Sequence, residues 1–197
     1  MYKIKMLNSV SDEMKKKVIE MDNAAFPVDD WGTLEEAEII YTAKNDSLIL
    51  LLKDDEPVGF LTIFATNRMY FENAARTDCA FYSSLTHEIL SDEKTDAVYC
   101  HCFLLLPEHR GHGLVYALYK CMKEWLVSKG TDPGHPVYAE AVSNEGLNCL
   151  KRIGFKTIHD YAQKGKLQAV SCGDALANID SLIKDMPGIC GIPVEMD

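Results

Sequence analysis

The feature that most constrains this chain is an apolar segment that runs directly into a glycine-containing turn and then into an amphipathic helix. Residues 98–106 are rich in β-branched, aromatic and apolar side chains, which predicts a strand buried on both faces. The turn contains Arg110, Gly111 and Gly113. From Leu114 onward apolar residues recur at spacings of three and four, which predicts a helix that Gly130 ends. The segment therefore predicts a strand, a tight turn and a helix, an arrangement typical of α/β folds.

The glycine turn suits an anionic ligand. The first N–H groups of a helix lack intrahelical acceptors and the helix dipole is positive there, so the backbone can hold a diphosphate. Gly111 and Gly113 lack a Cβ and allow a ligand to approach closely. An ordinary tight turn before a core helix fits these residues as well, because neither GxxxxGK[ST] nor GxGxxG is present.

A second segment repeats this strand-to-helix order. Residues 137–142 predict a strand, Ser143 predicts a helix cap, and the helix runs through Ile153. Gly154-Phe155 then leads into another strand.

Together the two segments resemble the GNAT N-acetyltransferase superfamily. The family's first signature, an apolar strand followed by RxxGxG/A, matches residues 105–115, and its second, an Asn shortly before Gly-Phe, matches Asn144 and Gly154-Phe155. The motifs lie in residues 98–155, and the layout is similar over about residues 1–172. The resemblance implies an α/β (α+β) fold with a mixed, mostly antiparallel central sheet of about seven strands, flanked by helices. It also implies that strands splay apart where the cosubstrate, acetyl-CoA, binds.

The resemblance assigns the acetyl-CoA contacts to two places. The strand end would hold the pantetheine by main-chain hydrogen bonds, the turn would wrap the pyrophosphate, and Asn144 would touch the pantetheine or adenosine-phosphate arm. The residues of the strand end and turn are Leu105, Leu106, Pro107, Arg110, Gly111, His112, Gly113, Leu114 and Val115. Backbone N–H near Leu105 would stabilise the oxyanion.

Two positions depart from the family pattern. Val115 stands where a small residue is usual, and its branched side chain would crowd a diphosphate if it faced one. Lys151 stands where the family often has a Tyr that protonates the leaving thiolate. Lys151 either is solvated, lies close to a CoA phosphate, or stabilises the thiolate electrostatically.

Attack on a thioester needs an uncharged amine and therefore a base. In the family, the positions of Tyr99 and His101 often carry that base, and His101 has a suitable intrinsic pKa. A buried histidine with satisfied hydrogen bonds is the equal alternative. Strict alternation along residues 98–106 predicts that His101 shares a side with Phe103 and Leu105 and faces away from both neighbouring cysteines.

Candidate acceptor contacts lie in three places. Glu140 and Tyr138 would share one side of their strand, and Glu140 either attracts or deprotonates an amine or pairs with a neighbouring cation. Asp29, Asp30 and Trp31 lie in a loop where the family commonly places acceptor-binding residues. They either shape a pocket for an amine or belong to an anchored loop with exposed carboxylates. An insertion at about 66–96 either walls the acceptor pocket or packs its own aromatic residues. An extension at about 173–197 lines the site, mediates dimerisation or covers the sheet.

Composition sets broader limits. The 197 residues, 47% of them apolar, predict a single domain with one α/β core. The resemblance implies that this domain is GNAT-like over 1–197. The net charge of −10 argues against nucleic-acid binding through a basic surface and favours cationic acceptors. Seven cysteines without a CxxC pair indicate core thiols, no metal site and a reducing compartment. Apolar runs too short for a bilayer, with no signal core, predict a cytoplasmic protein that does not bind membranes.

Patterns elsewhere complete the expected layout. They predict a strand at 2–6, a helix capped by Ser11, a helix at 33–43, a hairpin of 47–52 with 57–65, strands flanking Gly165, and a capped helix at 174–185. In the helix after Gly113, Tyr116 is expected on the polar face with Lys120, Lys123 and Glu124.

By this resemblance, the chain is expected to transfer acetyl from acetyl-CoA to a primary amine by direct attack in a ternary complex. A homodimer is one expected role of the C-terminal extension. The alternative is a CoA-binding sensor or interaction module that keeps the fold and has lost efficient chemistry.

Overall fold

The computed structural model describes residues 1–7, 11–26, 35, 38–40, 48–91, 95–162, 167–184 and 186–196. The strands are β1 (Tyr2–Leu7), β2 (Leu48–Lys53), β3 (Glu56–Thr66), β4 (Ala97–Leu105), β5 (Val137–Ala141), β6 (Lys156–Asp160), β7 (Gln168–Cys172) and β8 (Val194–Met196). The α-helices are α1 (Asp12–Ala25), α3 (Arg68–Arg76), α4 (His87–Ser91), α5 (Leu114–Ser128), α6 (Asn144–Ile153), α7 (Ala175–Ile183) and α8 (Pro187–Cys190). Two 3₁₀ turns, η2 (Phe81–Ser84) and η3 (Pro107–His109), complete the described elements.

The strands form one mixed sheet in the order β6-β7-β5-β4-β3-β2-β1-β8. Only the β4–β5 and β1–β8 pairs are parallel among the described strands. The expected mostly antiparallel sheet flanked by helices is confirmed. The strand beyond the expected number is β8, which the C-terminal extension adds beside β1.

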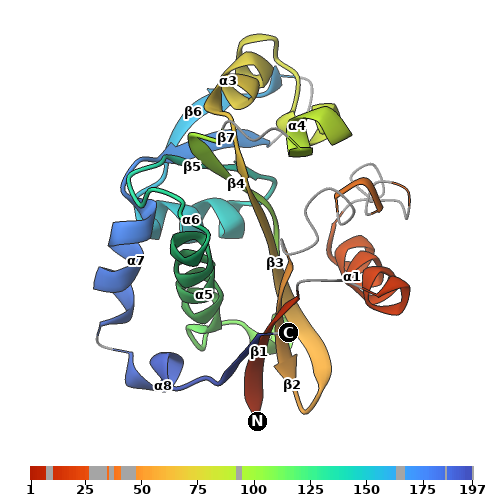
Figure 1. Cartoon of the computed structure of the whole chain (residues 1–197), viewed down its shortest axis with the longest axis vertical. Coiled ribbons are helices and arrows are strands. Elements are labelled where there is room, and N and C mark those ends of the chain that lie inside the picture. Colours follow the sequence, from red (N-terminus) through yellow and green to blue (C-terminus); the bar gives the residue numbers. More distant parts are fainter. Residues whose placement is uncertain are drawn as a thin grey trace.

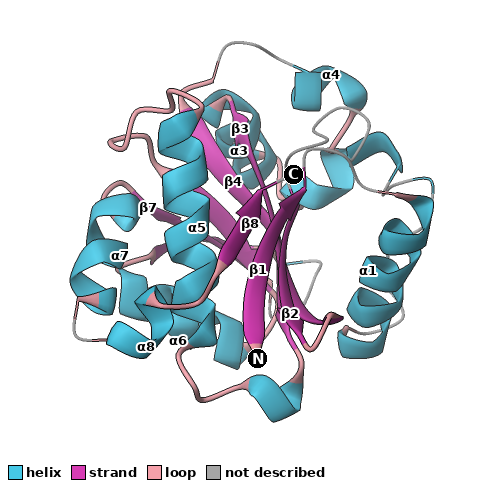
Figure 2. Cartoon of the chain, turned by 60° about the horizontal axis from the view of Figure 1, so that its bottom comes forward, coloured by secondary structure: helices cyan, strands magenta, loops and turns pink. Residues whose placement is uncertain are grey.

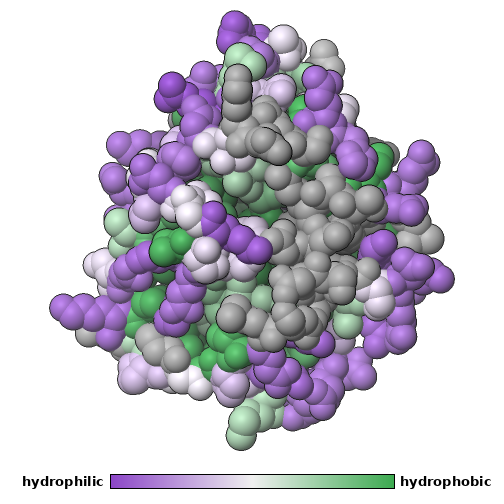
Figure 3. Space-filling model, viewed as in Figure 1, coloured by the Kyte–Doolittle hydropathy of each residue, from purple (hydrophilic) through white to green (hydrophobic). Residues whose placement is uncertain are grey.

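Helices cover both faces of the sheet and create two apolar cores (Figures 1 and 2). On one face α5 and α7 cover side chains such as Ile63, Val98 and Val170. On the other face α1 and the 66–96 insertion cover Leu50, Phe64 and Tyr99. Hydrophilic side chains predominate on the described part of the surface in Figure 3.

The two parallel strands at the centre separate before they end. Their pairing spans Val98 with Val137 through Cys100 with Ala139 and stops there, although β4 continues to Leu105. Antiparallel β3 stays paired with β4 along its length. The predicted splay is therefore present and opens between the C-terminal halves of β4 and β5.

Local sequence signals account for most element boundaries. The Ser11 hydroxyl accepts from Met14 N–H at 3.3 Å, and the Ser143 hydroxyl accepts from Gly146 N–H at 3.0 Å, so both predicted caps are confirmed. The helix predicted at 174–185 is present as α7, but the Asp174 side chain before it makes no capping hydrogen bond, so the predicted cap is wrong. Most of the predicted 33–43 helix and Gly165 lie outside the described residues.

The predicted face of Tyr116 is wrong. Its side chain is buried, because α7 and α8 pack against α5 in addition to the sheet. A helix covered on two sides has room for only a narrow exposed stripe. The lysines at 120 and 123 and Glu124 lie at that stripe or its rim.

The insertion at 66–96 forms α3, η2 and α4 and packs its aromatic residues inward. Phe71 and Phe81 are fully buried, and their ring centroids lie 5.8 and 4.6 Å from that of Tyr99. Asp78, just beyond α3, accepts a hydrogen bond from His159 of β6 at 2.8 Å. The insertion therefore packs on β4 and is fastened to β6 at the edge of the sheet.

Within the described ranges, no helix combines the length and apolar character needed to cross a membrane.

Candidate functional site

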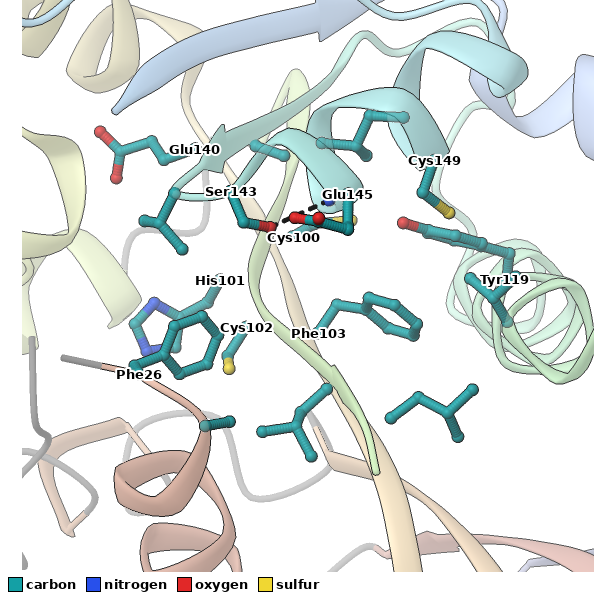
Figure 4. Close-up of a pocket in the computed structure, with 18 of the residues that line it drawn as sticks. Phe26, Cys100, His101, Cys102, Phe103, Tyr119, Glu140, Ser143, Glu145 and Cys149 are labelled. Atoms are coloured by element: carbon teal, nitrogen blue, oxygen red, sulfur yellow. Dashed lines mark hydrogen bonds between the residues drawn. The ribbon is translucent and has the colours of Figure 1, made fainter. Parts of the chain in front are cut away.

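A cavity of about 790 Å³ lies at the splay and is lined by residues from both faces of the sheet. One half is lined from α5 and α6, including Tyr119 and Cys149, and the other from Asp22 of α1 and from Phe26, the residue after α1. Figure 4 shows the two groups on opposite sides of β4. A long ligand that enters beside α5 can therefore reach the α1 face without leaving the cavity.

The glycine turn forms the entrance on the α5 side. Gly111 and Gly113 have φ values of +82° and +74°, a left-handed conformation that glycine adopts without strain. Within the described part of the chain, the main-chain amides of residues 111–115 donate to no other main-chain group, and the first helical bond runs from Tyr116 N–H to Gly113 C=O. These amides and the positive helix end suit a diphosphate.

Neighbouring groups hold the turn in place. The Arg110 Nε donates to the Leu105 carbonyl at 2.8 Å and leaves the rest of its guanidinium at the cavity. Arg110 is the one Arg or Lys among the described lining residues. A Cβ on Gly113 would lie 3.3 Å from Ile189 Cδ1, so α8 packs directly behind the turn. Val115 also lines the cavity, partly packed in the core.

His101 lies at a bulge that breaks the alternation of β4. Thr62 pairs with Cys102 and Ile63 with Cys100, so His101 is an extra residue opposite the β3 strand. The His101 ring centroid lies 5.8 Å from that of Tyr99, on the same side as predicted. The predicted faces beyond the bulge are wrong, because Phe103 and Leu105 lie with α5 and Cys102 lies on the α1 side with His101.

The bulge brings Cys102 to a carboxylate that sequence reasoning missed. The Cys102 thiol donates to Asp22 Oδ1 of α1 at 3.2 Å. Burial, followed by the charge of Asp22, raises the pKa of Cys102 well above its usual value, so the thiol stays protonated. Among the described residues no group of three or more His, Cys, Asp or Glu side chains could hold a metal ion.

Glu140 lines the cavity, but its carboxylate is saturated with donors. Oε1 accepts from Phe81 N–H at 2.7 Å, and Oε2 accepts from Tyr82 N–H and the Tyr99 hydroxyl at 3.0 Å each. This geometry ties β5 to η2 of the insertion and places Tyr82 in the cavity wall. It supplies neither a lysine nor an arginine partner, the alternative expected from the sequence.

The α5 side of the cavity contains an aromatic pair and a hydroxyl. The rings of Phe103 and Tyr119 stack with centroids 5.7 Å apart. The Tyr119 hydroxyl points into the cavity beside Cys149 (Figure 4). Burial is the main cause that raises the pKa of Tyr119 well above its usual value.

The structure brings together only part of the predicted set. The predicted residues at the cavity are Tyr99, His101, Leu105, Arg110, Gly111, Gly113, Leu114, Val115 and Glu140. Those that do not line it are Leu106, Pro107, His112, Tyr138, Asn144 and Lys151. Asn144 and Lys151 are exposed on α6, whereas Tyr138 packs on Phe71 with centroids 4.4 Å apart. Asp29, Asp30 and Trp31 lie outside the described residues.

The acetyltransferase (GNAT) family model matches residues 15–155, which contain the turn, the splay and His101. The chain belongs to the GNAT acetyltransferase family. The sequence resemblance is therefore confirmed, and the matched residues include most of those that line the cavity. A comparison with curated protein sequences gives no match.

Solved structures with the GNAT fold superpose on most of this chain. The NatC complex bound to Gag peptide and CoA has a TM-score of 0.63 at 12% identity, covering 87% of this chain and 98% of that chain. Ard1 from Thermoplasma volcanium has a TM-score of 0.61 at 12% identity, with coverages of 87% and 96%. Arabidopsis thaliana Naa50 with a CoA-Ac-MVNAL bisubstrate analogue has a TM-score of 0.57 at 14% identity, with coverages of 87% and 97%. These likenesses confirm the fold of this GNAT chain.

Proposed function

We propose that this GNAT protein transfers acetyl from acetyl-CoA to a primary amine by direct attack in a ternary complex. The observation that carries the proposal is the single cavity that joins the glycine turn to His101 through the sheet. Solved relatives of the same fold hold CoA or a CoA–peptide analogue, which supports a CoA thioester as the donor.

The donor's diphosphate would lie against the amides of residues 111–115, with the Arg110 guanidinium beside it. The pantetheine would follow β4 into the splay, where strand β5 no longer occupies the main-chain groups of β4 beyond Cys100. The thioester would then stand between the two faces of the sheet.

The acceptor amine would approach from the α1 side, where His101, Asp22 and Tyr82 line the cavity. His101 is the proposed base, acting directly or through water, because its ring lies at this end and imidazole titrates near neutral pH. Glu140 is a poorer base, because protonating it would cost the hydrogen bonds that it accepts.

The alternative function is a CoA-binding module without efficient transfer. One observation favours it: Lys151, at the position where the family often has an acid, is exposed and does not line the cavity. Catalysis would then require another group at the sulfur.

An acceptor screen tests the proposal. Acetyl-CoA is incubated with the protein and a panel of polyamines, amino-acid amines, aminoglycosides and peptides, and free CoA thiol and N-acetyl product are measured. We expect at least one amine to release thiol above the rate with water and to gain acetyl. CoA binding with no amine acetylated would contradict transfer and favour the module.

A further inference from the structure

We infer that the Tyr119 hydroxyl is the hydrogen-bond donor to the sulfur that leaves when the acyl group is transferred. This inference rests on the proposed function, since it assigns a role within the same cavity. Tyr119 lies on α5, whereas the position where the family often has a thiolate-protonating Tyr lies on α6 and is Lys151 in this chain.

The cavity offers few hydroxyl donors near its centre. The Tyr99 hydroxyl already donates to Glu140 at 3.0 Å, and Tyr82 lines the cavity beside Glu140, to which its amide donates. The Ser143 hydroxyl accepts from Gly146 N–H at the exposed start of α6. The Tyr119 hydroxyl donates to no side chain or carbonyl among the described residues, although it lines the cavity. The Tyr119 hydroxyl can therefore donate a hydrogen bond to a ligand in the cavity without breaking a hydrogen bond within the protein.

The ring position directs that hydroxyl to the splay. Tyr119 is 2% exposed, and its ring stacks on Phe103 of β4 at 5.7 Å, so the side chain has little freedom. Its hydroxyl points into the cavity beside Cys149 (Figure 4), and Cys100 lines the same cavity. Cys100 is the last residue of β4 paired with β5, and His101 follows it directly. Tyr119 therefore stands at the opening of the splay, across β4 from the proposed base (Figure 4).

The chemistry needs a donor there. As the amine nitrogen forms its bond to the acyl carbon and gives a proton to His101, the carbon–sulfur bond breaks and its electron pair goes to sulfur. The thiolate accepts a hydrogen bond from Tyr119 and takes a proton from water after release. Burial keeps the Tyr119 proton on oxygen, so the phenol stabilises the negative charge without losing its proton.

The test replaces only the hydroxyl. Tyr119→Phe keeps the ring that stacks on Phe103, and Tyr116→Phe is the matched control, because Tyr116 is a buried tyrosine on the same helix that does not line the cavity. The thiol pKa of protein-bound CoA is measured from thiolate ultraviolet absorbance. Acetyl transfer to any accepted amine is measured as kcat and KM.

We expect Tyr119→Phe to raise the thiol pKa of bound CoA by about one unit and to lower kcat by about 10-fold, with little change in KM for acetyl-CoA. Tyr116→Phe should change neither quantity. An unchanged thiol pKa in Tyr119→Phe, or equal changes in both variants, would overturn the assignment. The pKa measurement needs no acceptor, so a failed amine screen contradicts the proposed function alone, whereas failure of the wild type to bind CoA overturns both.

Discussion

At the residue scale, the extra residue in β4 decides which side chains meet at the reacting centre. His101 is placed on the α1 side, and the thiol of Cys102 follows it there to Asp22 at 3.2 Å. We expect His101→Ala to lower kcat about 100-fold or more, because a positioned general base contributes at least about that factor. The acetyl-CoA-dependent rise in melting temperature should persist, since the glycine turn is untouched. Unchanged turnover in the variant would rule out His101 as the base.

Also at the residue scale, we expect that removing the Glu140 carboxylate destabilises the fold. Glu140→Ala leaves two amides and the Tyr99 hydroxyl without their acceptor. We expect the free energy of unfolding, measured with urea, to fall by about 2–4 kcal/mol. Glu145→Ala is the control, because Glu145 is an exposed carboxylate next to the same cavity. It should change stability by less than about 0.5 kcal/mol. Equal losses in the two variants would contradict the fastening role of Glu140.

Asp78 gives a pH-dependent prediction. The hydrogen bond from His159, and then that from Ala162 N–H, lower the pKa of Asp78 below its ordinary value. A lowered folded-state pKa stabilises the protein above the unfolded-state pKa and loses that contribution as pH falls through the folded-state pKa. Asp78→Asn should therefore reduce the free energy of unfolding at pH 6, and its difference from wild type should shrink as pH falls below about 3.9. A difference that stays constant from pH 6 to pH 3 would contradict the assignment.

At the scale of elements, Gly113 of the left-handed turn lies between the cavity and α8. Gly113→Ala and Gly130→Ala both place a Cβ at positive φ, +74° and +77°, and each should cost about 1–2 kcal/mol of stability. Only Gly113 has a neighbouring element against its missing Cβ, Ile189 at 3.3 Å, and only Gly113 lines the cavity. We expect Gly113→Ala alone to weaken acetyl-CoA binding, by about 10-fold in Kd measured by calorimetry. Equal Kd values for the two variants would place the donor elsewhere.

The elements also separate what a sequence can predict from what it cannot. The caps Ser11 and Ser143 and the turn glycines act within a few residues of themselves, so their signals were sufficient. The bulge at His101 depends on pairing with β3, and β8 near the C-terminus forms only because it pairs with β1 near the N-terminus. Asp22 reaches Cys102 because α1 packs on the sheet. In the sequence, Asp22 cannot be told apart from an exposed carboxylate of an amphipathic helix. Such long-range contacts leave no local pattern in one sequence.

At the scale of the whole molecule, the sheet separates two compartments and the splay joins them. The α5 side offers Arg110, Tyr119 and the amides of residues 111–115, which bond to no main-chain group in the described ranges, and the α1 side offers His101 and Asp22. The C-terminal extension supports the first compartment through α8, and the 66–96 insertion walls the second through Tyr82. Both additions to the motif region therefore lie at the cavity, the insertion by lining it and the extension by packing behind Gly113.

The most direct test of this account is the melting temperature of the wild-type protein with increasing acetyl-CoA, beside CoA and ATP. At about one hundred times Kd, a ligand specific for the folded state adds about 2.7 kcal/mol of stability. We predict a saturable rise with acetyl-CoA and CoA and no comparable rise with ATP, which shares the nucleotide and phosphates but lacks the pantetheine. No rise with acetyl-CoA, or an equal rise with ATP, would contradict a cavity built for a CoA thioester.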